Sequence, residues 1–192
     1  MIHFDCVPEP PDFDREVRQK GEDWLARNPD KKRPRDLWSP FRKQLADGFQ
    51  NLCGYSAMFE PIGTVDHYIS CHQDHTKAYD WANYRFASGW INSSKKNLDD
   101  QVFDPFEVQN GWFEVELRTF RLVPQLDKIP EREWARAKLT LQKLHLDNDE
   151  RFVRLRREWY RMYDSGELSL DGLEKKAPLV ARAIRKRTIT TD

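Results

Sequence analysis

The stretch Gly63-Thr-Val-Asp-His-Tyr-Ile69 decides the fold of the middle of this chain. Its β-branched and aromatic residues favour a short strand. A polar loop follows over 70–80, a second short strand is expected around 84–88, and a helix is expected from about 91. This order predicts a small unit of two strands and a helix, with Asp66 and His67 on the first strand.

Four polar residues of this unit suit the hydrolysis of a phosphodiester bond: Asp66, His67, Asn83 and Asn92. Such a reaction needs an activated water and a cation that stabilises charge on the phosphate. A histidine, with an ordinary pKa of about 6.5, can accept the proton of the water near neutral pH. A carboxylate and an amide oxygen suit a hard cation such as Mg²⁺. For the Asp-His pair alone, a surface acid beside a structural histidine is the simpler interpretation.

Taken together, these residues resemble the HNH endonuclease motif over about 53–108. That motif has an acid-His pair on the first strand, an Asn that opens the second strand and Asn-x-x-Lys on the helix. Here these read Asp66-His67, Asn83 and Asn92-x-x-Lys95. The resemblance implies an α+β fold with a small ββα-metal HNH core, flanked by N-terminal and C-terminal helices.

The resemblance also implies a role for each residue of the motif. His67 would be the general base that deprotonates water. Asp66 and Asn92 would bind one Mg²⁺ or Mn²⁺ ion, which stabilises the leaving 3′-oxygen. Asn83 would tie the loop and orient the base, so that His67, Asn83 and Asn92 form the expected catalytic set.

Many relatives in this family carry two Cys-x-x-Cys pairs that bind a structural zinc. The corresponding positions here hold Cys53, Ser56, Ser88 and Ile91. Ser and Ile are poor zinc ligands. No structural zinc is therefore expected, and nearby aromatic side chains would replace it by packing.

Basic residues and one further histidine are the candidate contacts to nucleic acid. Lys95 occupies a position where the family often has a basic residue, and Lys96 follows it. His75 lies in the polar loop. A third group lies on one helix face by its i, i+3 and i+7 spacing: Arg154, Arg157 and Arg161. The alternative for these arginines is a solvated face paired with neighbouring acids.

Helices are expected on both sides of the middle unit. We expect an N-terminal helical segment over 1–50, the HNH-like core over 51–110, and a β-hairpin with C-terminal helices over 111–192, all in one compact domain. The apolar spacing predicts individual helices over 12–28, from Ser39 to near Asn51, over 131–145, over 148–163, and over 170–187 with an interruption at Pro178.

The composition excludes several classes of protein. The 32 basic residues balance the 32 acidic residues, so any site for a polyanion must come from local clustering. No run of about 18 apolar residues is present, and the N-terminus lacks the pattern of a signal peptide. The three cysteines do not form a disulfide framework. A cytoplasmic protein without a membrane partner is expected.

A narrower resemblance is to the HNH proteins of bacterial anti-phage defence systems of the Septu and retron types. It depends on Leu52-Cys53-Gly54-Tyr55, Asp66-His67, Trp81-Ala82-Asn83 and Asp104-Pro105-Phe106. It implies an ATPase partner that supplies part of the affinity for nucleic acid. Two alternatives stay open: a catalytically inactive HNH-like binding or regulatory module, and a helical interaction protein in which the motif is a chance match and its residues lie far apart.

Overall fold

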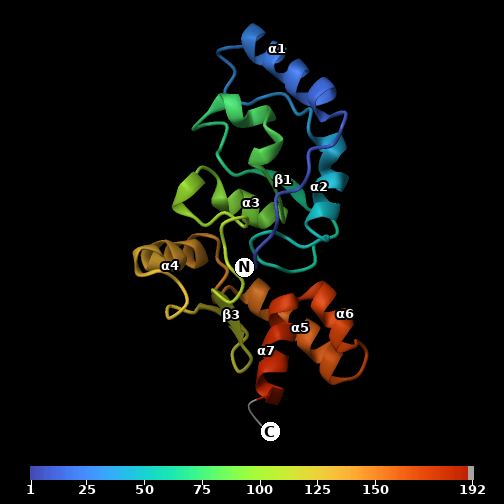
Figure 1. The fold of residues 1–192 in the computed structure, drawn as a ribbon, viewed down its shortest axis with the longest axis vertical. Helices are drawn as coiled ribbons and strands as arrows, with labels where there is room; N and C mark the ends of the chain where they lie inside the picture. The colour runs from blue at the N-terminus through green and yellow to red at the C-terminus, as the bar shows by residue number, and fades with distance from the viewer. Residues whose placement is uncertain (190–192) are drawn as a thin grey trace.

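The computed structural model describes residues 1–189 as a mixture of helices and two small antiparallel sheets of two strands each. This architecture fits the expected α+β class. Figure 1 shows an elongated molecule in which the first helix lies at one end and the last helices of the chain lie at the other. None of the helices described is both long enough and apolar enough to cross a membrane.

The N-terminal segment folds into two helical stretches joined by an irregular connection. The first begins as a π-turn, η1 (Asp14–Arg18), and continues as α1 (Gln19–Arg27). The second begins as a 3₁₀ turn, η2 (Ser39–Phe41), and continues as α2 (Arg42–Gly48). Both helices were predicted from their apolar spacing. Phe13 before the first stretch is fully buried, as the predicted stripe requires.

The middle segment contains the predicted strands and helix. Strand β1 (Thr64–His67) pairs antiparallel with β2 (Tyr84–Ala87), so that His67 lies opposite Tyr84. Helix α3 (Gly89–Lys95) follows β2 directly, because the Ser88 side chain accepts a hydrogen bond from the backbone N–H of Ile91 and caps the helix. The loop between the strands holds two 3₁₀ turns, η3 (His75–Tyr79) and η4 (Trp81–Asn83).

The C-terminal part begins after the 3₁₀ turn η5 (Asp99–Gln101) with a second hairpin, β3 (Phe113–Glu116) and β4 (Arg121–Pro124). A turn η6 (Glu131–Glu133) leads into α4 (Trp134–Lys143). The remaining helices are α5 (Glu150–Asp164), α6 (Leu170–Lys176) and α7 (Pro178–Ile189). The predicted interruption at Pro178 is confirmed, since this proline begins α7 instead of lying inside a helix.

Two clusters of buried apolar residues stabilise the fold, and the middle segment contributes to both. The first joins the N-terminal helices to the hairpin through Phe13, Leu45 and Phe86. The second joins α3 and the residues after it to the C-terminal half through Ile91 and Phe103. In Figure 1 the middle unit lies between α1 and the C-terminal helices, with α2 beside it.

Candidate functional site

Asp66, His67 and Asn92 line one open pocket of about 310 Å³ between the first hairpin, α3 and the irregular segment before α2. Lys96, at the end of α3, lines the same pocket. The interpretation as a helical interaction protein predicted that these three motif residues lie far apart, and this prediction is wrong. Asn83 and Lys95 do not line the pocket.

Strand pairing and helix packing bring the three residues together. Asp66 and His67 are the last two residues of β1, and the whole of this short strand lines the pocket. Asn92 lies one turn into α3, and its Nδ2 donates a hydrogen bond of 3.2 Å to the backbone oxygen of Val65. This bond fixes the helix against the strand. It also leaves Asn92 Oδ1 without a hydrogen-bond partner among the described residues.

His67 is held in one orientation and one neutral tautomer. Its Nε2 lies 2.9 Å from the backbone oxygen of Ala78, and because a carbonyl can only accept, Nε2 carries the proton. Nδ1 then keeps a lone pair. Trp38 packs edge-on against the imidazole with ring centroids 4.5 Å apart, and Tyr84 does so at 4.9 Å. Burial lowers the pKa of His67 below its ordinary value of 6.5, opposed by the bond to Ala78 and by the charge of Asp66.

Asp66 is almost fully buried and has a partner at each oxygen. Tyr55 donates a hydrogen bond of 2.6 Å to Oδ2, and the ammonium of Lys95 lies 3.4 Å from Oδ1. Burial, together with the charge of Asp66, raises the pKa of Tyr55 well above its ordinary value, so Tyr55 stays a protonated donor. Because each carboxylate oxygen has two lone pairs, these two contacts leave each oxygen of Asp66 with one lone pair unused.

Lys95 does not take the position expected for a phosphate contact. Its side chain is 0% exposed, and Nζ donates hydrogen bonds of 3.0 Å to the backbone oxygen of His67 and 2.8 Å to that of Tyr68. With Asp66 beside it, all three of its N–H groups are directed into the protein. Lys95 therefore connects α3 to the end of β1, and the prediction of a direct contact to nucleic acid is corrected here.

Asn83 ties together the loop that joins the two strands. Its Oδ1 accepts a hydrogen bond of 2.7 Å from the backbone N–H of Ile69. Its Nδ2 donates to the backbone oxygens of Ile69 at 2.9 Å and of Lys77 at 3.0 Å. The side chain is buried, so Asn83 can position the loop that carries Ala78, the partner of His67, but it does not reach the pocket itself.

Lys96 is the exposed lysine of the predicted pair. It follows the last residue of α3 with a φ of 47° and a ψ of −113°, outside the conformations that a residue with a side chain ordinarily adopts. Strain of this kind persists only where the surrounding structure imposes it, and it is common near functional sites. The side chain lines the pocket beside Asn92.

Two basic residues of the pocket were missed by the sequence analysis. Lys32 and Arg33 lie on the irregular segment that lines one side of it, and Asp36 of the same segment also lines the pocket. Neither side chain forms an ion pair or hydrogen bond with a described residue. The sequence NPDKKRP over 28–34 was the signal, since it places three cations in a row, but nothing local places that loop opposite Asp66.

The other predicted contacts lie outside the pocket. His75 lines a neighbouring depression, described below. The helix spacing of Arg154, Arg157 and Arg161 leaves all three exposed on α5, and none lines the pocket. Arg161 pairs with two acids, Glu158 and Glu167, which agrees with the alternative of a solvated, paired face for that residue.

Of the four positions compared with zinc ligands, Cys53, Ser56 and Ile91 are buried and Ser88 is half-buried. Cys53 is buried, and its sulfur lies 3.4 Å from the backbone N–H of Ser88. Ile91 is fully buried in the second apolar cluster, together with Tyr55. Whether the chain binds a structural zinc stays a prediction.

Few residues of the pocket could hold a metal ion. No group of three or more His, Cys, Asp or Glu side chains among the described residues is arranged to do so. The pocket offers the carboxylate of Asp66 and the free amide oxygen of Asn92. Two oxygen ligands fit Mg²⁺, which keeps several waters and takes further oxygens from a phosphate. They do not form a complete cage for a structural ion.

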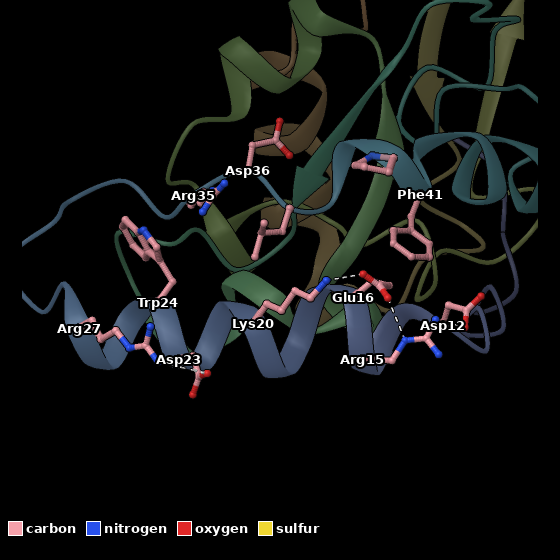
Figure 2. A pocket seen from close by; sticks show the side chains of 12 residues that line it. Asp12, Arg15, Glu16, Lys20, Asp23, Trp24, Arg27, Arg35, Asp36 and Phe41 are labelled. Atoms are coloured by element: carbon pink, nitrogen blue, oxygen red, sulfur yellow. Dashed lines mark hydrogen bonds and ion pairs between the residues drawn. The ribbon is translucent and has the colours of Figure 1, made fainter.

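A larger depression, of about 800 Å³, lies between α1 and the segment that leads into α2, as Figure 2 shows. Its charged side chains pair largely with one another: Arg15 contacts Asp12 and Glu16, and Lys20 contacts Glu16. Four acids and four bases line it, so their charges balance. This balance makes the larger depression a poorer candidate for an anionic substrate than the pocket at Asp66 and His67.

Comparison with family models, with curated proteins and with solved structures finds no match for this chain. The resemblance to HNH endonucleases, the defence role and the ATPase partner therefore stay predictions.

Proposed function

We propose that this chain is an HNH-type endonuclease that hydrolyses phosphodiester bonds, in DNA, with the help of a divalent cation. The observation that carries the proposal is the common pocket of Asp66, His67 and Asn92, with β1, β2 and α3 in the order that the ββα-metal motif requires. All three residues line this one pocket, which is open to solvent.

His67 is the general base of the proposed reaction. Because Nε2–H is bound to the backbone oxygen of Ala78, Nδ1 is the atom that accepts the proton of the attacking water. The lowered pKa keeps the ring neutral, and hence able to accept a proton, at pH 7. Trp38 and Tyr84 hold the ring plane, so that Nδ1 keeps its direction during the reaction.

Asp66 and Asn92 would hold a divalent ion such as Mg²⁺ or Mn²⁺, which supplies charge stabilisation at the phosphate and at the leaving 3′-oxygen. Tyr55 and Lys95 position the carboxylate of Asp66 for this task. Lys32, Arg33 and Lys96 around the pocket attract the phosphodiester, since none of these three cations is neutralised by a described carboxylate.

Plasmid nicking tests this proposal. The parent chain should nick supercoiled plasmid with Mg²⁺ or Mn²⁺ and stay inactive in EDTA. His67→Asn should lose about 10²- to 10⁴-fold in rate, the usual contribution of a general base. The matched control is His145→Asn, because His145 lies outside the pocket at a φ of 54°, a conformation that Asn tolerates. Equal rates for parent and His67→Asn would refute the assignment.

A second candidate function is an HNH-like module that binds nucleic acid without cutting it. The ion pair of Asp66 with Lys95 favours it, since the only carboxylate among the proposed ligands is already partly neutralised. This module would bind a DNA strand with the same dependence on Lys32 and Lys96. It would leave the plasmid intact at all concentrations of Mg²⁺ or Mn²⁺, which separates the two functions.

A further inference from the structure

A second depression, of about 340 Å³, lies beside the proposed catalytic pocket and shares Lys32 with it. Lys31 and Lys32 line it from the irregular segment after α1, and His72 and His75 line it from the loop between β1 and β2. Two segments that are about 40 residues apart in the chain thus place four potential donors to an anion in one hollow.

The charges of this depression are available to a ligand. Lys31 and Lys32 are exposed, and their ammonium groups contact no described carboxylate. Asp30 is the one acid of the lining. Asp74, next to His75, uses its Oδ1 to accept hydrogen bonds from Thr76 N at 2.8 Å and Thr76 Oγ1 at 2.6 Å. In the larger depression at α1, by contrast, the cations Arg15 and Lys20 form ion pairs with acids.

The two segments are fixed relative to each other and to the catalytic pocket. Tyr79, in the 3₁₀ turn that begins at His75, donates a hydrogen bond of 2.9 Å to the backbone oxygen of Arg35. Trp38, three residues after Arg35, packs against the ring of His67. These two contacts connect the segments that line the hollow with the ring of His67.

We propose that this hollow is a subsite for a second phosphate of the substrate, one that neighbours the phosphate held at Asp66 and His67. This inference rests on the proposed function and extends it. The substrate is a strand with at least two consecutive phosphates, and it binds along Lys96, Lys32 and Lys31. A mononucleotide or an isolated diester occupies only half of the site. Lysine ammonium groups and imidazole N–H groups are suitable donors to phosphate oxygens.

Binding of short oligothymidylates in EDTA, where the proposed reaction does not proceed, tests the subsite on the full chain. TpT has one bridging phosphate and TpTpT has two. The parent chain should bind TpTpT about tenfold or more tightly than TpT, because charge-assisted hydrogen bonds at one further phosphate contribute at least that much. The double variant Lys31→Gln, His75→Gln should bind TpTpT no more tightly than TpT, with the affinity that the parent chain has for TpT.

The salt dependence of binding to a longer oligothymidylate gives a second readout. Removing Lys31 should reduce the slope of log K against log salt by about 1. The matched control is Lys138→Gln with Lys143→Gln, two exposed lysines of α4 outside both hollows, which should leave the slope unchanged.

Equal affinity of the parent for TpT and TpTpT, or an unchanged preference in the double variant, would overturn the subsite. If the chain nicks plasmid through His67 but binds TpT and TpTpT equally, the subsite proposal fails and the proposed function stands. If the chain prefers TpTpT but does not nick plasmid, the subsite exists and the enzymatic proposal fails.

Discussion

Two adjacent lysines at the end of α3 have opposite environments and so should respond differently to the same substitution. Lys95→Met removes the ammonium that neutralises buried Asp66 and satisfies two backbone oxygens. Breaking a buried pair in this way costs about 3–5 kcal/mol. Lys96→Met at the exposed neighbouring position should change the free energy of unfolding by less than about 0.5 kcal/mol. Urea unfolding of both variants measures the difference, and similar values for the two would contradict the burial of Lys95.

The environment of His67 predicts how activity and stability depend on pH. Because burial lowers its folded-state pKa below 6.5, the base stays neutral at pH 6.5 and the rate should fall only at lower pH. Trp38→Ala would open the ring to water, and the acid limb of the pH–rate profile should then move upward toward 6.5. If the acid limb has the same inflection in Trp38→Ala as in the parent, Trp38 does not lower the pKa of His67 by shielding it from water.

The same shift has a consequence for folding. Below pH 6.5 the unfolded chain binds a proton at His67 before the folded chain does. Stability is therefore fully present above pH 6.5 and is lost as the pH falls through the folded-state pKa. Urea midpoints measured from pH 7.5 to 5 should decline less in His67→Asn than in the parent.

At the scale of elements, a buried ion pair ties β2 to the turn that follows η5. Arg85 donates hydrogen bonds of 2.6 and 2.5 Å to the two carboxylate oxygens of Asp104, and both side chains are at most 9% exposed. Arg85→Met alone should cost about 3–5 kcal/mol, because it leaves the carboxylate buried without its partner. A double-mutant cycle with Asp104→Leu should give a coupling energy of roughly 0.5–3 kcal/mol. Additive costs would show that the two residues act independently.

The elements around the site could be predicted from sequence, whereas several of their contacts could not. The residue types along 63–95 predicted β1, β2 and α3, since these elements depend on neighbouring residues. The burial of Lys95 had a local signal, because it lies four residues after buried Ile91 on the same helix face. Arg156, fully buried four residues after Phe152, had the same signal. The positions of Lys32 and Arg33 had none, because they depend on contacts such as Tyr79 with Arg35, 44 residues apart.

At the scale of the whole molecule, the middle segment depends on both layers of helices for its stability. Residues 51–110 were expected as the HNH-like core of one compact domain. In the fold, the backbone N–H of Phe103 donates to Thr140 Oγ1 at 2.9 Å, and that of Phe59 donates to the backbone oxygen of Lys176 at 2.8 Å. Buried side chains such as Ile91 continue this contact into the C-terminal half. The proposed site therefore belongs to the full chain more than to a separable HNH unit.

A fragment of residues 1–110 should consequently fail to fold cooperatively, although it contains every residue of the proposed site. It would expose Ile91, Val102 and Phe103, which are at most 1% exposed in the full chain. Exposing three such side chains costs roughly 5–9 kcal/mol, comparable to the entire stability of about 5–15 kcal/mol of a typical domain. Near-ultraviolet circular dichroism during heating should show one sharp transition for the full chain and none for the fragment. A sharp transition in the fragment would contradict this dependence. It would mean that the first apolar cluster, which contains Phe13 and Leu45, is sufficient to fold the hairpin of β1 and β2 without the C-terminal helices.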